Sequence, residues 1–183
     1  MRYLILSDIH GSATALKAAL SYFELHKCDK LLILGDILYH GPRNVIPLGY
    51  APLEVAEILN AMRNQIVAVR GNCEAEVDQM VLKFDCSSDY QLFHDFGYTF
   101  FLTHGHLHTP ASHPSLPSQS IFMSGHTHLF ELHKDERGTI ILNPGSITIP
   151  KGGNVATYAL MTPEEVSIRT VAKDVIQKQL FLD

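Results

Sequence analysis

The histidines of this chain gather in two short clusters, each of which follows an apolar run. Residues 102–106 read Leu-Thr-His-Gly-His, and residues 124–128 read Ser-Gly-His-Thr-His. Eight of the eleven histidines lie between His94 and His133. Imidazole nitrogens ligate divalent metals and exchange protons near neutral pH, so this clustering indicates a metal site or an acid–base site.

Five apolar runs of the sequence end in side chains that are able to ligate a metal. In chain order, these side chains are Asp8 with His10, Asp36, Asn72, His104 with His106, and His126 with His128. Each short motif alone also fits ordinary turn chemistry, in which Asp and Asn are common. Their joint occurrence at the ends of successive runs favours a shared site, because ligands of α/β sheets bind beyond the carboxyl ends of the strands.

The elements that must position these side chains can be placed from hydrophobic periodicity and turn residues. In the N-terminal half, strands are expected at 2–7, 30–36 and 65–72, and helices at 13–27, 52–62 and 74–82. In the C-terminal half, hairpins are expected at 90–105, 129–146 and 155–172, with a further strand at 120–128 and a loop at 109–118. The pattern predicts one mixed sheet facing helices and one mostly antiparallel sheet, stacked with the helices outside.

Composition bounds the class of protein. The 183 residues carry 46% hydrophobic side chains and a net charge of −5, which suits one globular domain over residues 1–183. No run of basic residues is present, so neither duplex nucleic acid nor a membrane is expected as a partner. The three cysteines lack the spacing of a disulfide framework. The N-terminal apolar stretch is too short for a signal-peptide core. These features predict a reduced, cytoplasmic protein.

The motif order Asp-x-His, Gly-Asp, Gly-Asn, His and Gly-His-x-His resembles that of the calcineurin-like metallophosphoesterase family. The match spans residues 8–128, and Asn-Pro-Gly-Ser at 143–146 extends it. Within the family, the short length and the Gly-Asn-Cys at 71–73 are most similar to the YfcE-type bacterial phosphodiesterases. The resemblance implies a four-layer α/β/β/α sandwich of two mixed sheets flanked by helices.

The resemblance also implies two divalent metal ions per chain. One ion would be held by Asp8, His10 and His128, the other by Asn72, His104 and His126, with Asp36 bridging both. Nitrogen and oxygen ligands without thiolate favour Mn²⁺ as the first expectation, with Zn²⁺, Fe and Ni²⁺ left open. A hydroxide bridged by the two metals would then attack a small phosphodiester.

The remaining site residues are expectations of the same resemblance. Asn72, Cys73 and His104 are the expected catalytic residues, and Arg43, Cys73, His106 and Lys151 the expected substrate contacts. Many family members carry His where Cys73 stands. The thiol at this position, in place of an imidazole, disfavours hydrolysis of monoesters. The sequence after Asp36 reads Ile-Leu-Tyr-His-Gly, which departs from the protein phosphatases. Three alternatives stay open: a non-catalytic scaffold subunit of the same fold, a phosphomonoesterase, or a nucleotide pyrophosphatase. A homodimer is a further expectation.

Overall fold

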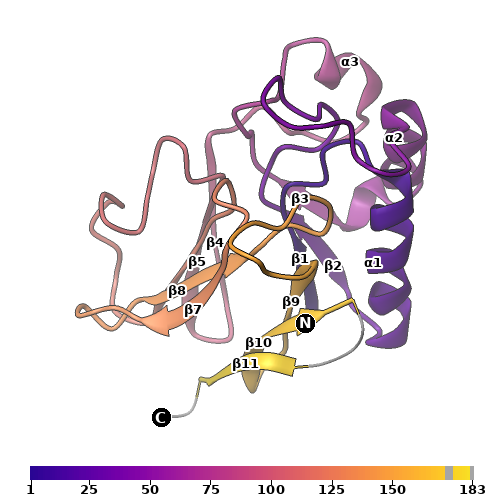
Figure 1. Cartoon of the computed structure of the whole chain (residues 1–183). Helices are drawn as coiled ribbons and strands as arrows, with labels where there is room; N and C mark the ends of the chain where they lie inside the picture. Colours follow the sequence, from indigo (N-terminus) through magenta and orange to yellow (C-terminus); the bar gives the residue numbers. More distant parts are fainter. Residues whose placement is uncertain (172–174, 182–183) are drawn as a thin grey trace.

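The computed structural model describes residues 1–171 and 175–181, which form two stacked sheets with helices against one of them (Figure 1). The helices are α1 (Ala13–Leu25), α2 (Pro52–Ala61) and the short α3 (Asp78–Val81), with a 3-10 turn at Arg63–Gln65. The strands are β1 (Tyr3–Leu6), β2 (Lys30–Ile33), β3 (Ile66–Ala68), β4 (Tyr90–Asp95), β5 (Tyr98–Thr103), β6 (Ser120–Met123), β7 (Phe130–Lys134), β8 (Ile140–Pro144), β9 (Thr157–Met161), β10 (Glu165–Thr170) and β11 (Val175–Leu180).

Both sheets are mixed. The first has the order β11-β10-β9-β1-β2-β3 and the second β4-β5-β6-β8-β7. All three expected hairpins are present, although residue 172, at the end of the third, lies outside the described residues. The expectation of a mostly antiparallel second sheet is wrong. Strand β6 enters between two hairpins and runs parallel to both β5 and β8, so two of the four pairings are parallel.

Alternation along the strands divides the apolar side chains between two main cores. Leu4 and Leu6 of β1 face the helices, whereas Tyr3 and Ile5 face the second sheet. In the second sheet, β5 repeats this pattern with Phe100 directed between the sheets. Because neighbouring residues of a strand point to opposite faces, a sheet buried on both sides needs a continuous apolar run. The apolar runs in the sequence have this physical cause.

The outer layers of the two sheets differ. Helices α1 and α2 pack on the first sheet (Figure 1). On the outer face of the second sheet, Phe101, Phe122 and Ile141 are instead covered by Leu116 from the loop between β5 and β6. Three prolines in 109–118 disfavour helical hydrogen bonding there. The expected α/β sandwich of two mixed sheets is confirmed, and its fourth layer among the described residues is this loop.

Local signals account for most helix boundaries. The Ser12 side chain accepts a hydrogen bond from the Ala15 backbone N–H and caps α1, and Pro52 opens α2. The third helix begins four residues later than expected, because the Glu74 carboxylate is bonded to backbone far from the helix. Strand β11 was not expected from the sequence. No helix in the described ranges combines the length and the apolar composition needed to cross a bilayer.

Candidate metal centre

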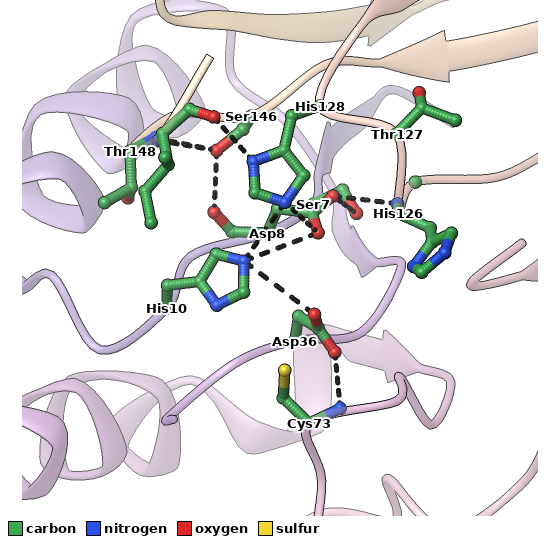
Figure 2. Close-up of polar contacts among 12 residues, drawn as sticks. Ser7, Asp8, His10, Asp36, Cys73, His126, Thr127, His128, Ser146 and Thr148 are labelled. Atoms are coloured by element: carbon green, nitrogen blue, oxygen red, sulfur yellow. Dashed lines mark hydrogen bonds and ion pairs between the residues drawn. The ribbon is translucent and has the colours of Figure 1, made fainter. Parts of the chain in front are cut away.

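Seven side chains meet where strands of both sheets end. They are Asp8, His10, Asp36, Asn72, His104, His126 and His128, the set expected from the motifs. Figure 2 shows the His10 ring between the carboxylates of Asp8 and Asp36, with His128 above it. Strands β1, β2 and β6 end within a few residues of these side chains, and β5 ends directly before His104. The site therefore lies at one edge shared by the two sheets.

Backbone conformation positions most of these side chains. Five of them have a positive φ, a region that side chains other than glycine seldom adopt: Asp8 (54°), His10 (48°), Asp36 (54°), His126 (67°) and His128 (60°). Asp, Asn and His are several-fold enriched in this region, so the ligand chemistry and the backbone conformation favour the same residue types. Such strained residues cluster at functional sites, where the surrounding structure holds them in place.

Asp8, His10 and His128 form a first group of ligand atoms. The Asp8 Oδ1 atom lies 3.2 Å from His128 Nε2 and 3.6 Å from His10 Nε2, and the two Nε2 atoms are 3.3 Å apart. His10 Nδ1 lies 2.8 Å from the Tyr39 carbonyl oxygen, and His128 Nδ1 lies 2.5 Å from that of Ile149. A ring that donates through Nδ1 leaves an electron pair on Nε2. Two such nitrogens and a carboxylate oxygen then point at one another.

Within the described part of the chain, Asp8 Oδ1 is buried and accepts no hydrogen bond. The other oxygen, Oδ2, accepts hydrogen bonds from Ser7 Oγ at 2.7 Å and from the His126 backbone N–H at 3.0 Å. A buried carboxylate oxygen without a donor is costly, whereas a cation between it and the two imidazole nitrogens would satisfy all three atoms. The donor set therefore fits a divalent metal ion.

Asp36 joins this first group to a second one. Its Oδ2 atom lies 3.7 Å from His10 Nε2, and its Oδ1 atom lies 3.4 Å from His104 Nε2. His104 Nε2 is also 3.1 Å from Asn72 Oδ1, while its Nδ1 lies 2.6 Å from the Leu34 carbonyl oxygen. The His126 ring completes this group, with its centroid 5.1 Å from that of His104. One carboxylate thus faces two separate sets of donors.

Contacts within the centre stabilise the charged forms of Asp8 and His104. Burial alone would raise the pKa of Asp8, but its contacts with His10 and His128 hold that pKa well below the usual range. Burial alone would lower the pKa of His104, but Asp36 outweighs it and raises the pKa to about 9. A metal must therefore displace a proton from His104, so its binding strengthens as pH rises through the titration of that imidazole.

A buried glutamate that the motif analysis missed organises the loops that carry the ligands. Glu74 accepts backbone N–H bonds from Asp36 at 2.8 Å, Ile37 at 2.6 Å and Gly71 at 2.5 Å. Burial and the Asp36 charge raise its pKa to about 7, although the three N–H donors favour ionisation. Glu74 thereby ties the loop after β2 to the loop that carries Asn72. Its place directly after Gly-Asn-Cys was the available signal.

We expect Glu74→Gln to lower the free energy of unfolding by about 2 kcal/mol, because an amide leaves at least one of the three buried N–H groups without an acceptor. Catalytic efficiency should fall by about tenfold or more as Asp36 and Asn72 shift, a loss typical of partners that orient metal ligands. Urea denaturation and kcat/KM measure the two effects. Glu76→Gln is the matched control, since that side chain is 94% exposed. Equal losses in both variants would contradict the positioning role of Glu74.

Sequence reasoning also missed two hydroxyl side chains that fix the other side of the centre (Figure 2). Ser146 Oγ donates to the Asp8 carbonyl oxygen at 2.9 Å and accepts from the backbone N–H groups of Thr148 and Ile149. Thr148 Oγ1 donates to the Ile9 carbonyl oxygen at 2.8 Å. The Asn-Pro-Gly-Ser motif thus serves to hold the strained turn after β1.

An open cleft of about 280 Å³ lies over the candidate metal ligands. Its lining consists of His10, Asp36, Gly41, Pro42, Arg43, Asn44, Asn72, Cys73, His126, His128 and Lys151. Three of the four expected substrate contacts, Arg43, Cys73 and Lys151, are therefore brought together. The fourth, His106, is absent from the lining, and its ring centroid lies 5.4 Å from that of His104.

Cys73 contributes both its backbone and its thiol to this cleft. Its backbone N–H donates to Asp36 Oδ1 at 2.9 Å, and its thiol lies within 4.8 Å of ligand atoms of His10 and Asp36. Burial and the Asp36 charge raise the pKa of the thiol above its ordinary value. This shift favours the protonated thiol, and a protonated thiol does not attack phosphorus.

Comparison with known proteins agrees with this geometry. A sequence model of the calcineurin-like phosphoesterase superfamily domain matches residues 1–166. Phosphodiesterase YfcE of Escherichia coli strain K12 is 45% identical over 169 residues, which cover 92% of this chain and 91% of the relative. The solved structure of Yfce, a phosphoesterase from E. coli, superposes with a TM-score of 0.95 and 40% identity, over 98% of this chain and 99% of that chain. Vacuolar Protein Sorting 29 from Cryptosporidium parvum shares the fold at a TM-score of 0.65 and 16% identity, over 98% of this chain and 97% of that chain.

Proposed function

Because this chain belongs to the calcineurin-like phosphoesterase superfamily, we propose that it is a metal-dependent phosphodiesterase acting on small phosphodiesters. The family resemblance of the motifs is thereby confirmed. One observation carries the proposal: Asp36 faces two sets of metal-ligand atoms directly beneath a cleft that also holds two cationic side chains, Arg43 and Lys151. The phosphodiesterase named as a relative supports it. We treat residues 1–183 as one domain for this activity.

The proposal assigns two metal ions to the centre. Asp8, His10 and His128 would hold one ion, Asn72, His104 and His126 would hold the other, and Asp36 would bind both. Mn²⁺ is our first choice for both ions, since no ionised thiol is among the donors, and Zn²⁺, Fe and Ni²⁺ suit the same set. When bound, such ions supply Lewis acidity toward phosphoryl oxygens and lower the pKa of coordinated water.

The side chains of the cleft then select and orient the ester. The guanidinium of Arg43 and the ammonium of Lys151 pair with phosphoryl oxygens at the rim. The Cys73 thiol adds no charge there, so the cleft balances a singly charged diester better than a doubly charged monoester. Asn72 and His104 act as ligands and thereby fix the Asp36 side of the centre. None of these roles needs a protein nucleophile.

A screen of phosphodiesters and phosphomonoesters, each with Mn²⁺, Zn²⁺, Fe²⁺ and Ni²⁺, tests this function. We expect turnover of diesters, with monoesters slower under every metal. Two alternatives become outcomes of the same screen. Efficient monoester or pyrophosphate hydrolysis would favour a phosphatase or a nucleotide pyrophosphatase. Metal occupancy without any turnover would favour a scaffold subunit. The presence of all seven ligand side chains supports the enzyme.

We expect Cys73→His to raise monoesterase activity relative to diesterase activity by about tenfold or more. An imidazole can be cationic near neutral pH, offset the extra charge of a monoester and donate to its leaving oxygen. The measurement is the ratio of kcat/KM for 4-nitrophenyl phosphate to that for methyl 4-nitrophenyl phosphate, which share one leaving group.

Cys73→Ser is the matched control for that substitution. It should keep diester hydrolysis within about threefold, because a neutral hydroxyl replaces a neutral thiol. Loss of diester hydrolysis in Cys73→Ser, with metals still bound, would give sulfur a direct chemical role. An unchanged ratio in Cys73→His would mean that position 73 does not face the substrate.

Three further assignments belong to this proposal. The enzyme works in the cytoplasm, which suits three cysteines without a disulfide among them. Its partners are small phosphodiesters rather than duplex nucleic acid or a membrane, in keeping with the net charge of −5. It forms a homodimer, which light scattering would test.

A further inference from the structure

A second hollow adjoins the cleft over the metal ligands. This apolar groove has a volume of about 400 Å³ and is lined by Leu38, Tyr39, Tyr50, Pro52, Leu53, Cys73, Ala75, Val77, Asp78 and Val81. Cys73 is among the residues that line both hollows, so the two hollows meet at this residue. A group attached to a phosphate in the cleft can therefore reach the groove past Cys73.

The chemistry of the groove differs from that of the cleft. The cleft carries Arg43, Lys151 and imidazoles, whereas no basic residue is among those that line the groove. The one acidic residue, Asp78, is engaged, since its carboxylate accepts the Ala75 backbone N–H at 2.9 Å. The cleft thus suits an anionic group, and the groove suits an apolar group.

Two tyrosine rings make the groove suited to aromatic groups. The Tyr39 ring packs edge-on against His40, with centroids 4.7 Å apart, and His40 packs edge-on against Tyr50 at 5.2 Å. The His40 ring thus contacts the rings of both tyrosines that line the groove. Aromatic side chains held in place in this way favour offset or edge-on contact with another ring.

We infer that the groove binds one ester group of the substrate and that this group is aromatic. The inference rests on the proposed phosphodiesterase function and specifies its substrate class. A phosphodiester has a single negative charge and two ester groups, so one hollow for the phosphate and a neighbouring apolar hollow match its shape and polarity. Leu53 and Val77 become residues that determine specificity through contact with the ester group.

Isothermal titration calorimetry on the metal-loaded protein tests the inference with ligands that cannot be hydrolysed. The ligands are diphenylphosphinate and dimethylphosphinate, which carry the single negative charge of a phosphodiester but have carbon–phosphorus bonds in place of ester bonds. We expect the wild-type protein to bind diphenylphosphinate at least about tenfold more tightly than dimethylphosphinate. Leu53→Asn and Val77→Asn should each lower that preference by about three- to fivefold and leave the affinity for dimethylphosphinate unchanged.

The design distinguishes three explanations of a negative result: a misfolded variant, a wrong phosphodiesterase proposal, and a groove that holds something other than an ester group. Leu53 and Val77 are 68% and 58% exposed, so their substitution leaves the core intact, and Leu25→Asn, at a 57% exposed residue on α1, is the control that should keep the preference. Failure of wild-type protein to hydrolyse bis(4-nitrophenyl) phosphate would count against the phosphodiesterase proposal, while the binding preference is read independently. The inference is overturned by a preference that survives in both groove variants. It is also overturned if either variant turns a dimer into a monomer in light scattering, because a second copy would then occupy the groove.

Discussion

Asp36→Asn should lower kcat/KM for a phosphodiester by on the order of a thousandfold, which exceeds the 10- to 100-fold losses usual for residues that merely orient ligands. Each oxygen of this carboxylate faces a different set of donors, at 3.7 Å from His10 Nε2 and 3.4 Å from His104 Nε2. An amide removes the charge and leaves one oxygen, so at most one set keeps its shared ligand. Elemental analysis should show metal content falling together with activity.

The substitution is informative because asparagine tolerates the local backbone. Asp36 has φ 54°, and Asn is among the residues that adopt this region most readily. The loss can then be ascribed to charge and coordination rather than to a refolded loop. His10 belongs to one ligand set only, so His10→Ala should lower kcat/KM less than Asp36→Asn does. His106→Ala should lower kcat/KM by less than about tenfold, because His106 is outside the assigned ligands. Comparable losses at Asp36 and His106 would show that the ligand assignment is wrong.

Removal of divalent metal should abolish turnover, to below about 1% of the starting rate, since activation of water by metal accounts for many orders of magnitude in such enzymes. Dialysis against a chelator, followed by addition of single metals, measures this effect, and Mn²⁺ should restore the highest rate. The midpoint of thermal unfolding gives a second readout. Saturating metal should raise the free energy of unfolding by about 3 kcal/mol at a hundredfold excess over the dissociation constant.

The thermal readout follows from the unpartnered oxygen of Asp8. That atom is buried, accepts no hydrogen bond from the described residues and faces two imidazole nitrogens. A metal bound there stabilises the folded chain only, because the unfolded chain lacks the arrangement. Asp8→Asn should therefore remove the share of the thermal shift that comes from the ion held by Asp8, His10 and His128, and leave the share from the second ion. Full turnover in protein shown to be free of metal, or a thermal shift unchanged in Asp8→Asn, would defeat this account.

The sequence allowed the ligand set to be predicted because the signals were local. An apolar run, then a glycine or polar turn, then Asp, Asn or His, recurred at five strand ends. The choice of seven ligands among these candidates, without His106, came from the resemblance of the motif order to the metallophosphoesterase family. Alternation along β1 likewise accounts for the two cores on either side of the first sheet.

Other features depend on contacts that are distant in sequence. Glu74 is followed by residues that suit a helix, yet its carboxylate bonds to backbone N–H groups of Asp36 and Ile37, which lie 38 and 37 positions away. Apart from its position directly after Gly-Asn-Cys, the local sequence does not distinguish that carboxylate from Glu76, which is exposed. The parallel pairing of β6 with β8 was missed for a related reason. Turn residues mark a hairpin in the sequence, whereas no local signal shows that a strand pairs between two hairpins.

The positive φ angles at Asp8, His10, Asp36, His126 and His128 have a consequence for how this chain can evolve. Each such residue costs about 1–2 kcal/mol relative to glycine, so the whole set opposes folding by several kcal/mol. Mutations toward glycine would relieve this strain but remove metal ligands, and at Asp8 and Asp36 they would also remove acceptors of backbone N–H groups, so selection for the reaction opposes them most directly at the histidines. A lineage released from that selection would drift first at the ligand turns, while both sheets stayed intact. Loss of catalysis with retention of the fold is therefore the easiest evolutionary path open to this architecture.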